Sequence, residues 1–140
     1  MTAPTILVVE DDAIISRHLQ FVLRKLGYTV DTIISSGTKT DNHVQVGHDT
    51  FIGRNCLIGA FCAIAGVTRI EDDVILWASV LVNKDLVIGK GAVILAGSGT
   101  ERSLEGGKTY WGIPAIEARK KWKEIAILKQ VVENFSGKKS

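Results

Sequence analysis

The chain has 140 residues and a formal net charge of +2, which is enough for one compact domain and predicts no polyanionic partner such as a nucleic acid. It contains no run of about 18 apolar residues, and its N-terminus lacks a basic region followed by an apolar one, so we expect neither a transmembrane span nor a signal peptide. The two cysteines, Cys56 and Cys62, form no Cys-x-x-Cys pair, which favours a reducing, cytoplasmic setting.

Residues 1–33 predict a β-α-β unit. The apolar run Ile6 to Val9 ends in three acids, as a buried parallel strand does when it ends at a site. A helix is then expected, with Asp11 or Asp12 as its N-cap and Gly27 as its C-terminal stop. Its apolar residues recur at helical spacing: Ile15, Leu19, Val22, Leu23 and Leu26. Tyr28 to Ile34 predicts the second strand.

This stretch, "TILVVEDDAIISRHLQFVLRKLGYTV", resembles the opening of a two-component receiver domain. In that family the acid pair, here Asp11 and Asp12, helps bind Mg²⁺. The resemblance ends near residue 33, before the strands that would carry the family's phosphoacceptor aspartate and its lysine. We therefore expect a structural cap and not a phosphotransfer domain, joined by a natural or an engineered fusion.

A repeat of six residues dominates residues 34–112. The repeated position is aliphatic in ten of eleven cases, Thr40 being the exception: Ile34, Val46, Ile52, Ile58, Ile64, Ile70, Leu76, Val82, Ile88 and Ile94. The next residue is often small, as at Gly47 and Gly53, and we assign it to a tight corner. The residue four places after the aliphatic one is small or β-branched, which makes Cys56 and Cys62 core residues. A period of six predicts a left-handed parallel β-helix of roughly three and a half coils.

Residues 113–140 predict a C-terminal helix and tail. Ile116, Trp122, Ala126, Leu128 and Val132 suggest an amphipathic helix, and Pro114 suits its first turn. Residues 116–140 hold seven Lys or Arg against three acids, so this end of the chain is basic. The helix is expected either to stabilise an oligomer or to bind a partner. A short solenoid has open ends, and we expect a closed homotrimer with sites between neighbouring subunits.

The two repeat histidines, His43 and His48, allow a metal-binding and a catalytic interpretation. Hexapeptide-repeat carbonic anhydrases use a similar pair but need a third histidine, and His18 lies on the N-terminal helix, so no metal site is expected. His48 lies just past a corner, and Gly66 lies one coil later, directly over it. A histidine base beside an exposed glycine N–H suits acyl transfer. Asp41 and Asp49 are the nearby carboxylates that would fix the tautomer.

The motifs "KTDNHVQVGHDTFIG", "AIAGVTRI" and "GGKTYWGIPA" resemble the N-acyltransferase family of lipid A biosynthesis over about residues 36–130. That family moves a 3-hydroxyacyl chain from acyl carrier protein to the 2-amine of UDP-3-O-acylglucosamine. The resemblance implies that His48 is the general base, Asp41 its supporting acid and Gly66 the oxyanion N–H. The residues expected to bind substrate are Asn42, His43, Gln45 and Lys84. Those expected to meet the acidic carrier protein are Arg119, Lys120, Lys121 and Lys123.

The chain departs from that family in three places. The family's N-terminal uridine-binding domain is replaced by the receiver-like fragment, Lys84-Asp85 stands where many members have Gly-His, and Trp77 occupies a corner usually held by glycine. These departures leave three functions open. The first is acyl transfer from a carrier-protein thioester to a UDP-linked amino sugar, with no bound cofactor. The others are acetyl-CoA-dependent N-acetylation of an amino sugar and a non-catalytic trimeric scaffold.

Overall fold

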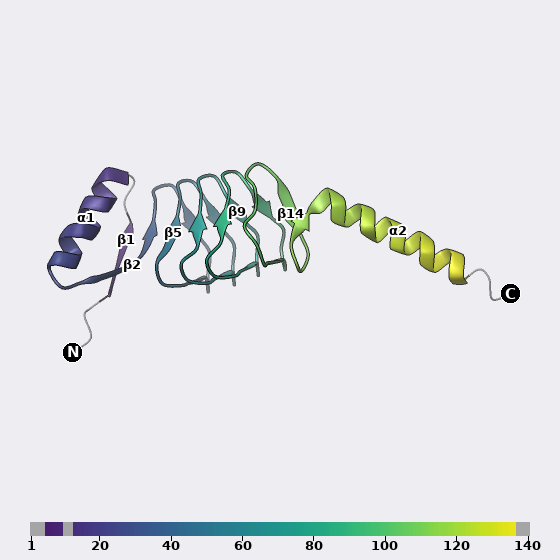
Figure 1. Ribbon diagram of the computed structural model, residues 1–140, viewed down its shortest axis with the longest axis horizontal. Helices are drawn as coiled ribbons and strands as arrows, with labels where there is room; N and C mark the ends of the chain where they lie inside the picture. Colours follow the sequence, from purple (N-terminus) through teal and green to yellow (C-terminus); the bar gives the residue numbers. More distant parts are fainter. Residues whose placement is uncertain (1–4, 10–12, 137–140) are drawn as a thin grey trace.

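The computed structural model describes residues 5–9 and 13–136 of the chain. It contains a β-α-β unit, a solenoid of short strands and a C-terminal helix, arranged in that order along one axis (Figure 1). The first unit consists of β1 (Thr5–Val9), α1 (Ala13–Lys25) and β2 (Thr29–Ile34). The solenoid strands are β3 (Lys39–Thr40), β4 (Gln45–Val46), β5 (Thr50–Ile52), β6 (Leu57–Ile58), β7 (Ala63–Ile64), β8 (Arg69–Ile70), β9 (Ile75–Leu76), β10 (Leu81–Val82), β11 (Val87–Ile88), β12 (Val93–Ile94) and β13 (Gly99–Thr100). The chain ends with β14 (Thr109–Trp111), β15 (Ile116–Glu117) and α2 (Ala118–Ser136).

The strands form three sheets, one for each side of a triangular coil. Their orders are β1-β2-β5-β8-β11, β4-β7-β10-β13 and β3-β6-β9-β12-β14-β15. The solenoid strands pair in parallel with the strand 18 residues later, as Gln45 pairs with Ala63 and Ala63 with Leu81. This register is the one that three hexapeptides per coil predict, and it confirms the left-handed parallel β-helix.

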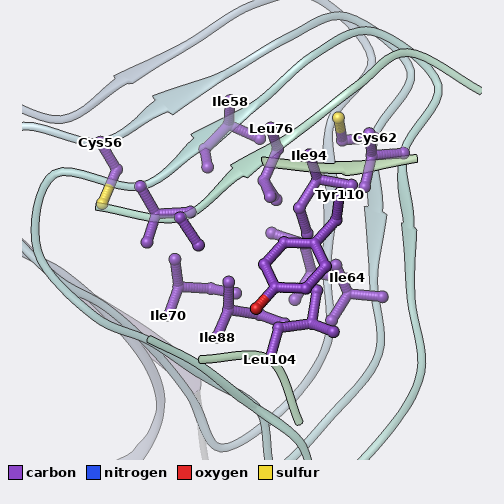
Figure 2. Packing of buried hydrophobic residues seen from close by; sticks show 14 of the residues in the cluster. Cys56, Ile58, Cys62, Ile64, Ile70, Leu76, Ile88, Ile94, Leu104 and Tyr110 are labelled. Atoms are coloured by element: carbon purple, nitrogen blue, oxygen red, sulfur yellow. The ribbon is translucent and has the colours of Figure 1, made fainter. Parts of the chain in front are cut away.

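The core runs along the inside of the prism, where the aliphatic positions of successive coils stack (Figure 2). Ile52, Ile58, Ile70, Leu76 and Ile94 are completely buried. The first coil is less enclosed: Ile34 and Val46 are partly buried and Thr40 is exposed. Each buried aliphatic side chain contributes about 1.5–3 kcal/mol relative to an exposed one, so the stack is the main source of stability.

Cys56 and Cys62 are free and buried, as expected for core positions. The Cys56 Sγ lies 3.1 Å from the Glu71 carbonyl oxygen, and the Cys62 Sγ lies 3.2 Å from that of Trp77. Burial raises the pKa of both thiols above its ordinary value. Both groups are therefore unreactive structural thiols.

The corners are formed differently from the sequence prediction. The left-handed backbone conformation falls three residues after each aliphatic position, at residues such as His43, Asp49 and Asn55, whose φ angles lie between 54° and 57°. Gly47 and Gly53, which were assigned to the tight corner, are absent from this group. A β-carbon on Gly47 would lie 2.4 Å from the Gly66 nitrogen, and one on Gly53 would lie 2.6 Å from the Asp72 nitrogen. Glycine is needed there because adjacent coils approach closely, and not because of φ.

Val67 is the β-branched residue among these left-handed positions, with φ at 62°. This conformation costs an L-residue roughly 1–2 kcal/mol, while asparagine adopts it more readily. Because the Val67 side chain is 51% exposed, little burial is lost on substitution. We expect Val67→Asn to raise the free energy of unfolding by about 1 kcal/mol in urea titrations. The matched change Val87→Asn, on strand β11, should give no gain, and equal shifts for both variants would contradict this explanation.

The N-terminal unit extends one sheet of the solenoid. Strand β2 pairs in parallel with both β1 and β5, so β1 becomes the edge of the sheet that continues into β8 and β11. Helix α1 packs on β1 and β2. It ends in a Schellman motif: Gly27 has φ 87°, its N–H donates to the Arg24 carbonyl, and the Tyr28 N–H donates to that of Leu23. This confirms the β-α-β prediction and the stop at Gly27. Asp11 and Asp12 lie outside the described residues.

The C-terminal segment corrects the sequence prediction. Pro114 follows a cis peptide bond in the turn between β14 and β15, which pair antiparallel, so it does not lie in a helical turn. Ile116 belongs to β15, and the helix begins at Ala118. Helix α2 packs through its first turns on β14 and β15 and then extends away from the solenoid (Figure 1). Neither described helix is long and apolar enough to cross a bilayer.

Candidate functional site

His48 and Gly66 are in direct contact on one corner of the solenoid. We call the residues 47–49, 65–67 and 83–85, which stack at this corner in successive coils, the His48 corner. The Val67 N–H donates to the His48 carbonyl at 2.8 Å and sets the vertical register. A β-carbon on Gly66 would lie 2.7 Å from His48 Nε2 and 2.9 Å from Cε1, so the imidazole rests against the bare Cα of Gly66. The expected stacking of residues 48 and 66 is present.

The Gly66 amide is available to a ligand. Within the described part of the chain, no acceptor receives a hydrogen bond from the Gly66 N–H, while its carbonyl accepts from the Asp85 N–H at 3.2 Å. Gly47, one coil before Gly66, places no side chain against this amide, because a β-carbon at residue 47 would collide with the Gly66 nitrogen. Two glycines thus hold an exposed imidazole next to an unoccupied N–H donor.

Asp49 is the carboxylate at His48. Its Oδ2 lies 3.0 Å from His48 Nδ1, and the two side chains are 56% and 67% exposed, respectively. A carboxylate accepts hydrogen bonds, so this contact favours the tautomer with the proton on Nδ1 and the lone pair on Nε2, the atom beside Gly66. An exposed ion pair contributes little to stability. The Asp49 carboxylate instead orients the His48 ring.

Asp41 lies at a different corner from His48. Its Oδ1 accepts a hydrogen bond from the Asn42 N–H at 2.8 Å, and within this chain it does not contact the imidazole. The residues 41–43, 59–61 and 77–79 stack at this second corner, which we call the Trp77 corner. In the single chain, Asp49 is therefore the carboxylate within hydrogen-bond distance of His48, and the supporting role that the resemblance implies for Asp41 stays a prediction.

The other expected site residues are divided between the corners. Lys84 lies one coil above Gly66 at the His48 corner, with its N–H bonded to the Asn83 Oδ1 at 2.8 Å. Asn42 and His43 lie at the Trp77 corner, where the His43 ring stacks on Phe61 with the ring centroids 5.0 Å apart. Gln45 lies on β4 between the corners and bonds to the Val46 carbonyl at 3.3 Å.

The expected carrier-binding residues lie on α2: Arg119, Lys120, Lys121 and Lys123. Lys121 forms an ion pair with Glu124 at 3.7 Å. Helix α2 leaves the end of the solenoid opposite to α1, whereas His48 lies in the turn between β4 and β5, near the α1 end (Figure 1). One chain therefore keeps the basic cluster away from its own His48.

Sequence reasoning missed a pocket and a supporting residue. A pocket of about 440 Å³ opens at the Trp77 corner and is lined by Lys39, Thr40, Asp41, Leu57, Ile58, Gly59, Ala60, Trp77 and Ala78. The small residues at 59, 60 and 78 beside a tryptophan were its only sequence signal. The buried Thr50 hydroxyl lies 3.4 Å from the carbonyl oxygens of both His48 and Ala65 and can donate its one proton to either coil of the His48 corner.

No group of three His, Cys, Asp or Glu side chains is arranged to bind a metal ion within residues 5–9 and 13–136. The chemistry that these residues offer is proton transfer at Nε2 of His48 and hydrogen-bond donation by the Gly66 amide. His48 is exposed and Gly66 is partly exposed at one corner, where an external nucleophile and an electrophilic carbonyl can approach them.

No protein-family model matches the chain. The chain is 37% identical over 125 residues to the UDP-3-O-acylglucosamine N-acyltransferase of Methylobacterium nodulans, a match that covers 89% of this chain and 35% of the relative. It is 43% identical over 91 residues to the enzyme of the same name from Campylobacter lari, covering 65% of this chain and 28% of the relative. The chain thus spans about a third of the length of the curated relatives that it matches. Among solved structures, serine acetyltransferase from Neisseria gonorrhoeae aligns with a TM-score of 0.47 at 19% identity, over 74% of this chain and 47% of that one.

Proposed function

We propose that the chain is an N-acyltransferase that moves an acyl group from a thioester donor to the amine of a nucleotide-linked amino sugar. The observation that carries the proposal is the His48 imidazole on Gly66, with Asp49 at its Nδ1. The N-acyltransferase relatives support the same reaction class, since two of them share 37% and 43% of aligned residues with this chain.

The proposed reaction needs one base and one oxyanion donor. His48 Nε2 takes a proton from the sugar amine as the nitrogen attacks the thioester carbonyl carbon. The Gly66 N–H donates to the oxygen that becomes negative in the tetrahedral intermediate. The C–S bond then breaks, and the leaving thiolate takes the proton from the imidazolium. The products are an amide and a free thiol, and the enzyme forms no covalent intermediate.

We propose acyl carrier protein as the donor, bound through the basic cluster Arg119, Lys120, Lys121 and Lys123. These cations occupy the first turns of α2, and the first turn holds no acid. A helix N-terminus disfavours positive charge, so the cluster does not serve the stability of the helix. It instead provides a positive surface that suits the acidic carrier protein.

A thioester assay tests the donor and the activity together. We expect thiol release from 3-hydroxyacyl carrier protein with UDP-3-O-acylglucosamine, at a rate well above that with acetyl-CoA. Faster turnover with acetyl-CoA would replace the proposal with an amino-sugar N-acetyltransferase. Absence of turnover with both donors in the folded protein would leave the scaffold function. His18→Ala, an exposed histidine on α1, is the matched control for histidine chemistry in the same assay.

We also propose that three copies of the chain associate through α2. Ile125, Leu128, Val132 and Phe135 follow 3-4-3 spacing on one face, the pattern of a coiled-coil seam. Leu128, Val132 and Phe135 are 61%, 61% and 75% exposed in the single chain. A helix of 19 residues with this much exposed apolar surface is marginal by itself in water, so association would stabilise it.

The oligomer is tested by light scattering. The chain is expected at three times its mass of 15.2 kDa, and Leu128→Asp combined with Val132→Asp should release monomers. Gln130→Asp adds one negative charge on the opposite face of α2, against two on the seam in the double variant, and should leave the trimer intact. A parent chain that is monomeric, or a double variant that stays trimeric, contradicts the role of this seam.

A further inference from the structure

The pocket at the Trp77 corner lies apart from the catalytic pair and has no role in the reaction steps above. Its residues come from three successive coils: Lys39 to Asp41, Leu57 to Ala60, and Trp77 with Ala78. Asp41, Gly59 and Trp77 occupy equivalent positions in these coils, because Thr40 pairs with Ile58 and Ile58 with Leu76. Adjacent coils lie about 4.8 Å apart, so Asp41 and Trp77 flank a gap roughly two coils high.

The gap is open because Gly59 has no side chain. A β-carbon there would lie 2.7 Å from the Ala78 nitrogen, so the packing of the coils requires glycine at this position. Ala60 and Ala78, which also line the pocket, have short side chains that do not fill it. A mainly apolar floor is thus bordered by Trp77 on one coil and by Asp41 two coils below it.

The walls of the pocket combine an aromatic face with two charges of opposite sign. The Trp77 side chain is 46% exposed. Asp41 uses Oδ1 for the Asn42 N–H, and in the described chain no partner contacts its Oδ2. Lys39 forms no ion pair with any described acid. An acyl chain in this pocket would remove water from both charges without replacing their hydrogen bonds, which disfavours a lipid occupant.

We propose that this pocket binds the base and phosphate of a nucleotide. The base stacks on the Trp77 indole, a ring N–H or amino group of the base donates to Asp41 Oδ2, and a phosphate pairs with the Lys39 ammonium. Stacking of a base on an aromatic side chain contributes about 1–3 kcal/mol. The nucleotide is that of the sugar substrate or the adenosine bisphosphate end of coenzyme A. Only this choice of source rests on the proposed function.

Calorimetric titration of the full chain tests the site without turnover. The probes are UDP, adenosine 3′,5′-bisphosphate and pyrophosphate. We expect saturable binding of at least one nucleotide and weaker binding of pyrophosphate, which has no base. Trp77→Ala should weaken the nucleotide about tenfold or more, and Trp77→Phe, which keeps an aromatic face, should restore most of the affinity. Ala78→Leu, which fills the pocket, should also weaken binding, whereas Trp122→Ala on α2 should not.

The site is overturned if neither nucleotide binds saturably at millimolar concentration. It is also overturned if Trp77→Ala binds the nucleotides as tightly as the parent does, or if pyrophosphate binds to the parent as tightly as the nucleotides do. A change of solution mass in Trp77→Ala would also overturn it, because it would assign the indole to a subunit contact. His48→Ala separates this site from the proposed reaction, since it should bind nucleotide like the parent. Nucleotide binding by a parent chain without turnover would reject the proposed function and keep the site.

Discussion

Replacing His48 by alanine is expected to slow acyl transfer by about 10²–10⁴-fold, the usual contribution of a positioned general base. The substitution removes Nε2, the atom that rests against Gly66, and leaves the backbone bond from the Val67 N–H to the His48 carbonyl in place. Because the side chain is 67% exposed, its loss creates no cavity. The rate is measured as thiol release at saturating donor, together with the unfolding midpoint.

The control for this prediction is His18→Ala, which removes an exposed imidazole from α1 and should keep the parent rate. A His48→Ala chain that retains more than about a tenth of the parent rate, with an unchanged unfolding midpoint, contradicts a role for His48 as the base. If His48→Ala loses both its rate and its folded structure, His48→Gln is measured instead, because glutamine keeps a polar side chain of similar length. A stable but slow His48→Gln chain supports the prediction, and a fast one rejects it.

Adding a single methyl group at Gly66 is expected to have the second-largest effect. The β-carbon of Gly66→Ala would lie 2.7 Å from His48 Nε2, closer than atoms can approach, so the ring must turn away from the amide. We expect a loss of about 10²–10³-fold in kcat, comparable to the loss of one oxyanion-hole donor. The nearest atoms belong to an exposed side chain, so the free energy of unfolding should change by less than about 1 kcal/mol.

A double-mutant cycle distinguishes displacement of the ring from a general disturbance of the corner. If Gly66→Ala acts by moving His48, it should cause little further loss in a His48→Ala background. Full additivity of the two losses would show that the methyl group acts independently of the imidazole. Gly47→Ala is the contrasting variant: its β-carbon would lie 2.4 Å from a backbone nitrogen, so it should lower stability as well as rate.

The two catalytic predictions depend on a difference between the glycines of the His48 corner: Gly66 contacts the imidazole, and Gly47 contacts the backbone of the next coil. The three atoms nearest to a β-carbon on Gly66 all belong to the His48 imidazole, whereas those nearest to a β-carbon on Gly47 are backbone atoms of residues 65 and 66. The buried Thr50 hydroxyl lies 3.4 Å from the carbonyl oxygens of both His48 and Ala65 and can donate its one proton to either. The bond from the Val67 N–H to the His48 carbonyl holds the backbone under the exposed pair of His48 and Asp49 in register with the next coil, and a catalytic group needs such a fixed position.

The sequence by itself determined the solenoid and the vertical pairing of His48 with Gly66. A repeat of six residues allows one arrangement of inward and outward positions, so Ile52, Ile70 and Ile94 had to be buried. The 18-residue coil then places residue 66 over residue 48. The stop of α1 at Gly27 was also readable, because few residues accept the left-handed conformation that ends a helix.

The tertiary structure alone decided the details that depend on side-chain direction and on the close approach of coils. It assigned Asp49, and not Asp41, to the imidazole of the same chain, because six-residue spacing puts residue 41 on a different corner. It moved Pro114 and Ile116 out of the helix and into a turn and a strand, since the antiparallel pairing of β14 with β15 outweighs helical periodicity there. It also revealed the pocket beside Trp77, whose walls come from residues 18 and 36 positions apart. A periodic pattern fixes which residues share a column, but the space between columns depends on how the side chains of neighbouring coils pack.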